Sequence, residues 1–154
     1  CDYRLQVKHY LVVCLGNICR SPIGEGWLRH VAMVRGLRVK VDSAGTSGYH
    51  VGSAPDRRSV IAMRAVNIDI SGQQSRKFVR ADFQKHDRIL VMDRSNLADV
   101  LSMARTDDEK AKVALFDPSG AEVPDPYYGG DEGFAEVREQ VRLAAEAQLS
   151  SDFP

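Results

Sequence analysis

The stretch "VVCLGNICRSP", residues 12–22, lies between a run of β-branched residues and a helix-starting Ser-Pro. The β-branched run from His9 to Val13 predicts a short buried strand. Ser21 and the proline after it predict a helix start with a capping hydroxyl and a proline in the first turn. That helix should run to about Arg35 and stop at Gly36. The small and polar residues between strand and helix therefore form a tight strand-loop-helix junction.

The same alternation of strand and helix patterns continues along the chain. Ile23, Trp27, Val31 and Val34 recur at helical spacing and should face the core. Further strands are expected in "LRVKVDS", "RILVMD" and "KVALF", and further helices over Pro55 to about Val66, about Ser95–Met103, and Phe134–Leu149. This order predicts an α/β fold, with a four-stranded parallel sheet in a doubly wound, Rossmann-like arrangement and helices on both faces.

Length and charge narrow the class of protein. A chain of 154 residues suits one domain, residues 1–154, with its own core. Its 21 basic and 21 acidic residues balance, so there is no global field to hold nucleic acid or an anionic membrane. The apolar runs are far shorter than the roughly 18 to 20 residues of a membrane helix. Three cysteines, two of them in one short loop, favour a reducing, cytoplasmic location over a disulfide framework.

The loop after the first strand has the composition of an anion site. A loop entering a helix can turn its N–H groups inward, next to the positive end of the helix. Gly16 permits a positive φ, and Asn17 is among the few other residues that tolerate it. The loop lacks the motifs of nucleotide-binding and dinucleotide-binding loops. Arg20 adds a planar fork that can hold two oxygens of a phosphate.

Cys14 faces the same helix terminus and the Arg20 guanidinium. Such surroundings lower a thiol pKa from about 8.5 to roughly 3.5–7.5, so Cys14 should be largely thiolate and placed to attack a bound phosphorus atom. The alternative is that Cys14 and Cys19 are small buried hydrophobic residues and Arg20 lies on a helix surface. The agreement of spacing, composition and context favours the first interpretation. Cys14, Ser43 and Asp93 each end a predicted strand, where ligands of open sheets collect.

Four segments together resemble the low-molecular-weight protein tyrosine phosphatase family. They occur in that family's order and are "VCLGNICRSP", "DSAGTSGYHVG", "ILVMDRSN" and "DPYYGG", spanning Val13 to Gly130. The resemblance implies the phosphotyrosine phosphatase I fold and hydrolysis of phosphotyrosine and aryl phosphate monoesters without metal or cofactor. It also implies inhibition by phosphate or vanadate-like oxyanions, and a monomer or a weakly self-associating protein.

The resemblance also assigns roles to individual residues. Cys14 would form a phosphocysteine, Arg20 would clamp the phosphate, and Asp125 would be the general acid. Cys19 would form a reversible disulfide with Cys14 under peroxide, a form of redox regulation. The phosphate-binding and supporting residues would be Leu15, Gly16, Asn17, Ile18, Cys19 and Ser21, with Ser43 beside Asn17 and Asp93 as a structural support. Gln73 departs from the family pattern, which often has histidine there.

Asp125 stands between Pro124 and Pro126, which stiffen the backbone on both sides. We expect burial beside the phosphate to raise its pKa and activity to peak on the acid side of neutral. Alternatively, Asp125 is a turn residue. Aromatic rings at a pocket rim can stack on a substrate phenyl ring. Tyr127 and Tyr128 should lie on this rim, although one of them could belong to the core, and Tyr49 with the neighbouring histidine is a candidate for the opposite wall.

Two other functions compete with the phosphatase. A thiol-dependent arsenate reductase shares this fold and loop but needs further cysteines downstream, and none follows Cys19. A non-catalytic phosphotyrosine-binding module would need neither a nucleophile nor an acid. The remaining features have simpler interpretations: His9, His30 and His86 as surface or satisfied core groups, and the basic segment "RKFVRADFQKHDR" as a solvated face.

Overall fold

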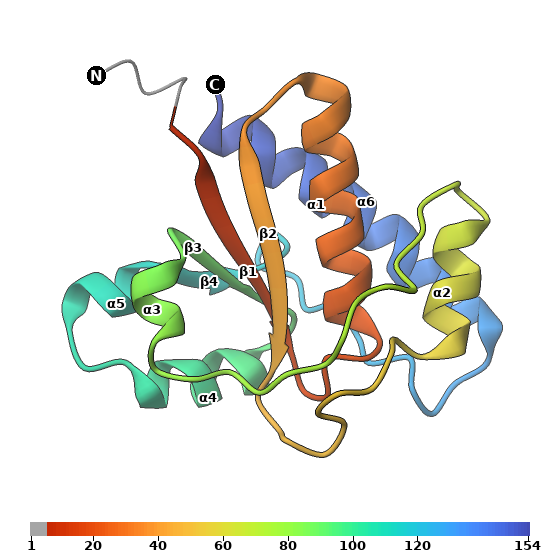
Figure 1. Ribbon diagram of the computed structural model, residues 1–154, viewed down its shortest axis with the longest axis horizontal. Helices are drawn as coiled ribbons and strands as arrows, with labels where there is room; N and C mark the ends of the chain where they lie inside the picture. The colour runs from red at the N-terminus through yellow and green to blue at the C-terminus, as the bar shows by residue number, and fades with distance from the viewer. Residues whose placement is uncertain (1–5) are drawn as a thin grey trace.

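A computed structural model describes residues 6–154, and its core is a parallel sheet (Figure 1). The strands are β1 (Lys8–Cys14), β2 (Val39–Gly45), β3 (Arg88–Val91) and β4 (Val113–Leu115). They pair in parallel in the order β2-β1-β3-β4. The predicted four-stranded parallel sheet is thus confirmed. Cys1, the third cysteine of the sequence, lies outside the described residues.

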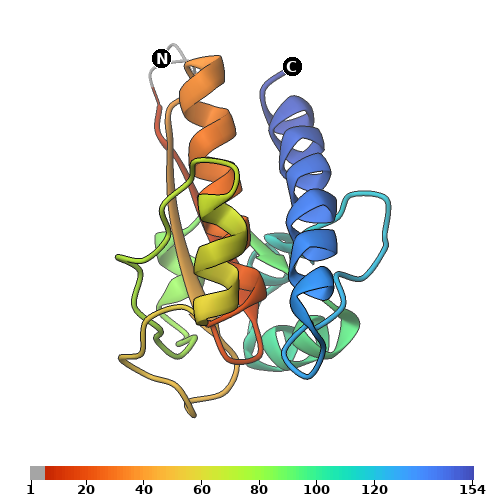
Figure 2. The ribbon, with the colours of Figure 1, turned by 90° about the vertical axis from the view of Figure 1, so that its right-hand side faces the viewer.

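Helices cover both faces of the sheet, as predicted (Figures 1 and 2). The helices of one face are α1 (Arg20–Arg35), α2 (Arg57–Arg64) and α6 (Asp131–Asp152), and α1 and α6 run side by side in Figure 2. The other face carries α3 (Asp82–Lys85), α4 (Arg94–Met103) and α5 (Asp107–Ala111). Within residues 6–154, none of these helices has the length and hydropathy that a bilayer crossing requires.

Alternation along β1 assigns its side chains to two cores. Tyr10, Val12 and Cys14 belong to the core beneath α1 and α6, whereas Leu11 and Val13 pack on the opposite face with residues of α3 and α4. Successive side chains of a strand point to opposite faces, so this division follows from the sequence. Burial of one large apolar side chain contributes roughly 1.5–3 kcal/mol, which fixes the register of β1. Cys14 is thereby placed on the side of α1.

The strand order also fixes where a ligand can bind. The chain moves from β1 outward to β2 and then crosses to β3 on the other side of β1. Ligands of such sheets bind beyond the carboxyl ends of the strands at this reversal. The loops after β1 and β2 meet at that end of the sheet, at the bottom of Figure 1, opposite the C-terminus.

Three expectations about helix ends and faces were wrong. Cys19, without a side-chain hydrogen bond, is the N-cap of α1, and Ser21 lies inside the first turn, so its hydroxyl does not cap the helix. Pro55 precedes α2, whose cap is the Asp56 carboxylate accepting the Arg58 N–H. Val34 is 69% exposed although it shares the direction of Ile23 around the helix. Its exposure therefore reflects its place in the last turn, beyond the packing partners of that face.

The basic segment before β3 is not a solvated face. Phe78 and Phe83 are buried edge to face, with ring centroids 5.3 Å apart. Asp82 and His86 are also buried, and the His86 Nδ1 lies 3.0 Å from the Asp82 carbonyl oxygen. The short helices α3 and α5 were not predicted, because four or five residues are too few to show helical periodicity.

Candidate active site

The loop from Cys14 to Arg20 is held from outside by its carbonyl oxygens. Those of Cys14, Leu15, Gly16, Ile18 and Cys19 accept hydrogen bonds from neighbouring segments. The donors are Thr46 N (2.9 Å), Ser47 N (2.9 Å), Ser75 Oγ (3.1 Å), Asp56 N (2.7 Å) and Ser59 Oγ (3.3 Å), respectively. In a trans peptide the next N–H points the opposite way, so the amides of residues 15, 16, 17, 19 and 20 face the inside of the loop. The loop is a concave ring of donors at the start of α1, which suits an anion.

Asn17 supplies the left-handed residue of this loop, with φ of 57°. Its side-chain amide is fully engaged. Oδ1 accepts the Arg76 N–H at 3.0 Å, and Nδ2 donates to Ser21 Oγ at 2.8 Å and Ser43 Oγ at 2.9 Å. Gly16 does not use the positive φ that glycine permits, since the positive-φ glycines of residues 6–154 are Gly36, Gly52 and Gly120. Gly16 instead permits close approach, because an added Cβ would lie 3.1 Å from His50 Cδ2.

The Cys14 thiol lies at the centre of the loop and is buried. Its Sγ accepts the Asn17 N–H at 3.3 Å and lies 3.1 Å from Ser21 Oγ. Because Ser21 Oγ already accepts from Asn17, its own proton is free to point at the sulfur. Two hydrogen-bond donors, the Asn17 N–H and the Ser21 hydroxyl, therefore converge on Sγ.

Arg20 lies beside the cysteine with its guanidinium buried. Nη1 donates to Asp93 Oδ2 at 2.6 Å and to the Val123 carbonyl oxygen at 2.9 Å. Nη2 lies 3.7 Å from Asp125 Oδ2. Because Nη1 has two acceptors, the plane of the Arg20 guanidinium is fixed. Asp93 also caps α4 through the Asn96 N–H, so this carboxylate joins the end of β3 to Arg20.

Asp125 belongs to the loop before α6 and lies close to Arg20. Its side chain is 37% exposed, and its Oδ2 is the atom that lies 3.7 Å from Arg20. Oδ1 also accepts the Tyr127 N–H at 3.0 Å. Asp125 is therefore a turn residue, as one interpretation of the sequence had it, and its carboxylate also lies close to Arg20.

A cavity of about 360 Å³ opens above the loop. It is lined by Cys14, Leu15, Gly16, Ile18, Cys19, Arg20, Ser47, Tyr49, His50, Asp125, Tyr127 and Tyr128. Tyr49 and Tyr128 are 88% and 94% exposed, whereas Tyr127 is half-buried against His50, at 6.5 Å between ring centroids. The structure thus brings the predicted rim tyrosines to one cavity and places Asn17, Ser21, Ser43 and Asp93 as hydrogen-bonding partners behind it.

Arg58 joins two walls of this cavity and was not predicted from the sequence. Nη2 donates to the Tyr127 carbonyl at 2.9 Å and Nη1 to that of Gly129 at 3.1 Å. The guanidinium also lies 4.5 Å from the Phe134 ring centroid and binds Asp56. Because the Asp56 N–H donates to Ile18, Arg58 connects the anion loop with the loop that carries Asp125. The helix-capping pattern could have revealed Asp56, but no periodic signal marks Arg58.

Cys19 is a second thiol beside the site. Burial, with the nearby Asp56 carboxylate, raises its pKa to about 12. At neutral pH Cys19 is therefore a thiol and not a competing thiolate. Both Cys14 and Cys19 are free in the structure.

A larger hollow of about 540 Å³ lies elsewhere, beside α1 and β2, and includes Gln73 in its wall. Gln73 donates from Nε2 to the Pro22 carbonyl oxygen at 3.1 Å, so this residue supports the start of α1. Glu25 lies on the same wall, and burial raises the pKa of its carboxyl. No cysteine is among the described residues that line this hollow. Cys14 and Arg20 both line the smaller cavity instead.

Residues 9–151 match the family model described as low molecular weight phosphotyrosine protein phosphatase. The curated protein of that name from Gallus gallus is 41% identical over 151 residues, covering 94% of this chain and 95% of the relative. A protein tyrosine phosphatase from Entamoeba histolytica, solved with Hepes in the active site, superposes with a TM-score of 0.89 at 34% identity, over 94% and 96% of the two chains. Vibrio vulnificus Wzb in complex with benzylphosphonate superposes with a TM-score of 0.85 at 28% identity, over 94% and 98%.

Proposed function

The chain belongs to the low molecular weight phosphotyrosine protein phosphatase family and is a protein-tyrosine phosphatase, and we propose that it works through a phosphocysteine on Cys14. In this proposal Arg20 binds the phosphate and Asp125 is the general acid. The observation that carries it is the convergence of Ser21 Oγ and the Asn17 N–H on the Cys14 sulfur inside a ring of inward N–H groups. A thiolate held in an anion site is placed to attack the phosphorus atom that the site binds.

The first step transfers the phosphoryl group to the enzyme. The Cys14 thiolate attacks phosphorus, and the S–P bond forms as the bond to the phenolic oxygen breaks. Asp125 gives its proton to the leaving phenolic oxygen, because a phenol has a pKa of about 10 and leaves poorly as an anion. Arg20 and the loop amides hold the other phosphate oxygens, where transition-state charge gathers.

The second step returns the enzyme to its starting state. Water attacks phosphorus as the Asp125 carboxylate takes its proton, and the P–S bond breaks. Inorganic phosphate leaves and the Cys14 thiolate is restored. Ser21, which directs its hydroxyl at Sγ, stabilises this thiolate as a leaving group.

The shape of the cavity supports aryl phosphates as the substrate class. Its volume accommodates an aromatic ring on a phosphate, and Tyr49, Tyr127 and Tyr128 offer rings at its rim. The benzylphosphonate bound to the Vibrio relative has the same combination of ring and oxyanion. We propose phosphotyrosine proteins or small aryl phosphates as substrates, and phosphate or vanadate-like oxyanions as inhibitors.

Three further proposals concern the chain as a whole. The extent of the family match supports one phosphatase domain over residues 1–154. Dependence on a free Cys14 supports work in a reducing compartment such as the cytoplasm. Under peroxide, Cys14 would become a sulfenic acid, and the Cys19 thiol would condense with it to a disulfide with loss of water, which protects the nucleophile from further oxidation.

The test is hydrolysis of para-nitrophenyl phosphate between about pH 4 and about pH 9 with reductant and no added metal. Activity should be greatest in acid, absent in Cys14→Ser, and reduced mainly on the acid side in Asp125→Asn. A rate that rises steadily into alkaline pH, or an active Cys14→Ser enzyme, would contradict the mechanism. An inactive natural protein that still binds phosphate would make the site one of recognition instead.

A further inference from the structure

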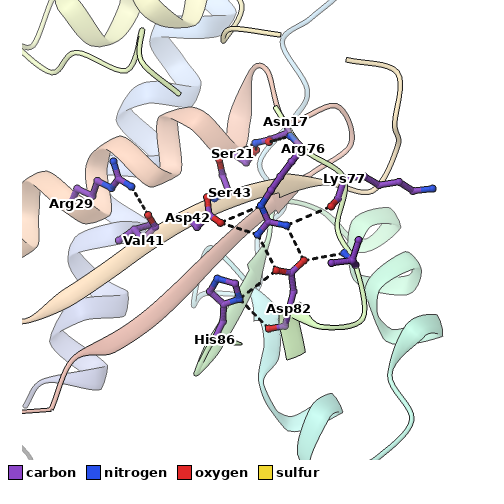
Figure 3. Close-up of polar contacts among 11 residues, drawn as sticks. Asn17, Ser21, Arg29, Val41, Asp42, Ser43, Arg76, Lys77, Asp82 and His86 are labelled. Atoms are coloured by element: carbon purple, nitrogen blue, oxygen red, sulfur yellow. Dashed lines mark hydrogen bonds and ion pairs between the residues drawn. The ribbon is translucent and has the colours of Figure 1, made fainter. Parts of the chain in front are cut away.

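Arg76 lies outside the cavity, in the irregular segment before β3, and is the centre of a polar network (Figure 3). Its guanidinium lies between two carboxylates. Nη2 and Nε bind Asp42 Oδ2 at 2.8 and 3.2 Å, while Nη2 and Nη1 bind the two oxygens of Asp82 at 2.9 and 3.0 Å. Asp82 is 2% exposed and belongs to α3, and Asp42 lies on β2. The side chain therefore fastens its segment to two fixed elements.

The main chain of Arg76 connects this clamp to the anion loop. Its N–H donates to Asn17 Oδ1, which leaves the two Nδ2 protons for Ser21 and Ser43. An amide that faced the other way would set Nδ2 against the Arg76 N–H, and two donors cannot bond to each other. Oδ1 would then accept from the Ser21 hydroxyl, whose proton would no longer point at the Cys14 sulfur. The Arg76 N–H thus selects the orientation of the Asn17 side chain.

The contacts close into a ring. From Arg76 the path runs through its guanidinium to Asp42, and the other oxygen of Asp42 accepts the Ser43 N–H at 2.9 Å. Ser43 Oγ accepts from Asn17, and Asn17 returns to Arg76. Every member is bonded on both sides, so a shift of Arg76 displaces Asn17 from two directions.

We propose that Arg76 is a positioning residue for the Cys14 chemistry: by holding its own N–H in place between Asp42 and Asp82, it orients Asn17, which directs Ser21 at the Cys14 sulfur. This inference rests on the proposed function of Cys14. Arg76 touches neither the sulfur nor the cavity-lining residues in the described contacts. Its N–H reaches the site through Asn17, and its carbonyl oxygen accepts the Gly45 N–H at the end of β2. The alternative is that the ion pairs merely stabilise the fold.

A double-mutant cycle separates the two roles. We would measure kcat/KM for para-nitrophenyl phosphate in the natural enzyme, Arg76→Gln, Asn17→Ala and the double variant. Glutamine cannot bridge the two carboxylates, so Arg76→Gln should lose about 10- to 100-fold, the size of effect that displacements of about 1 Å cause. If Arg76 acts through Asn17, the same change in the Asn17→Ala background should cost less than about threefold, because its target has gone.

Arg80 provides a matched control in the same segment. Its side chain is as exposed as that of Arg76, at 33% in both, and it likewise joins a carboxylate, Glu109, to a main-chain carbonyl, that of Met103. Nothing in the described contacts connects it to Asn17. Arg80→Gln should leave kcat/KM within about twofold and should act independently of Asn17→Ala.

Two results would overturn the proposal. One is an Arg76→Gln variant whose kcat/KM lies within about threefold of that of the natural enzyme. The other is a loss of kcat/KM on Arg76→Gln that has the same size in the natural and the Asn17→Ala backgrounds. If Arg76→Gln does not fold, Asp42→Asn replaces it in the cycle, because this carboxylate is 54% exposed and its substitution weakens one arm only. The natural enzyme and Cys14→Ser, measured alongside, test the proposed function itself. Their outcome does not depend on the cycle.

Discussion

Replacement of Asp93 by asparagine isolates the charge that faces Arg20. In the natural protein the Asp93 carboxylate accepts from Arg20 Nη1 at 2.6 Å, and the arginine side chain is only 3% exposed. The variant keeps the helix cap, because asparagine accepts the Asn96 N–H as well as aspartate does. It also keeps the Val123 carbonyl as a second acceptor for Nη1. What it loses is one charge-assisted hydrogen bond to a buried cation.

The expected cost is that of such a bond, about 1.5–3 kcal/mol of unfolding free energy. For a chain of this length each kcal/mol lowers the Tm by about 2–4 °C, so the ligand-free variant should melt about 3–12 °C lower. Phosphate changes this result, because its negative charge compensates Arg20 in place of the missing carboxylate. The Tm deficit should therefore shrink to about half or less in saturating phosphate.

The assay is thermal unfolding of both proteins with and without inorganic phosphate. Thr106→Ala serves as the control, because it removes the cap of α5, a hydrogen bond to the Glu109 N–H with no connection to Arg20. Its deficit should be the same in both buffers. Equal deficits for Asp93→Asn in both buffers would contradict this prediction, since phosphate would then not compensate Arg20 for the missing carboxylate.

Three other variants test separate parts of the account. Asp125→Asn should slow phenyl phosphate hydrolysis at least about 10-fold more than that of para-nitrophenyl phosphate, whose leaving group needs less help from an acid; equal losses would exclude Asp125 as the proton donor. Arg58→Met removes the donors to the Tyr127 and Gly129 carbonyls and should lower kcat for phenyl phosphate about 3- to 10-fold with an unchanged phosphate inhibition constant. A weaker phosphate inhibition would place Arg58 in the anion site instead. Burial raises the pKa of Glu25, so ionisation of this carboxyl destabilises the fold above that pKa and has no effect in acid. The urea midpoint of Glu25→Gln, relative to that of the natural protein, should therefore be higher at about pH 7.5 than at about pH 4. A difference in midpoint that does not depend on pH would contradict this.

The sequence carries the parts of the fold that depend on periodicity. The alternation of β1 places Cys14 on the face of α1, and the order of strand and helix patterns predicts the parallel sheet and both covering layers. The carboxyl ends of β1, β2 and β3 then place Cys14, Ser43 and Asp93 at one edge before any contact is known. The structure has them there, joined through Asn17 and Arg20.

Other features depend on contacts between distant segments and have no local signal. Val34 has the right direction on α1 but lies beyond its packing partners. Phe78 and Phe83 are buried within a stretch whose composition is that of a surface, and Arg76 of the same stretch pairs with two carboxylates from other segments. The exposure of Asp125 is likewise not determined by its two flanking prolines, which restrict the backbone dihedral angles but not the distance to neighbouring segments.

The measurement that tests the central claim most directly is the trapping of the covalent intermediate. The natural enzyme and Cys14→Ser would be mixed with para-nitrophenyl phosphate, quenched within one turnover, and their peptides analysed by mass spectrometry. The account predicts one phosphoryl group on the peptide that contains Cys14 in the natural enzyme, appearing as the first nitrophenol is released, and none in Cys14→Ser. Full turnover without a phosphoryl group on Cys14, or with that group on another residue, would contradict it.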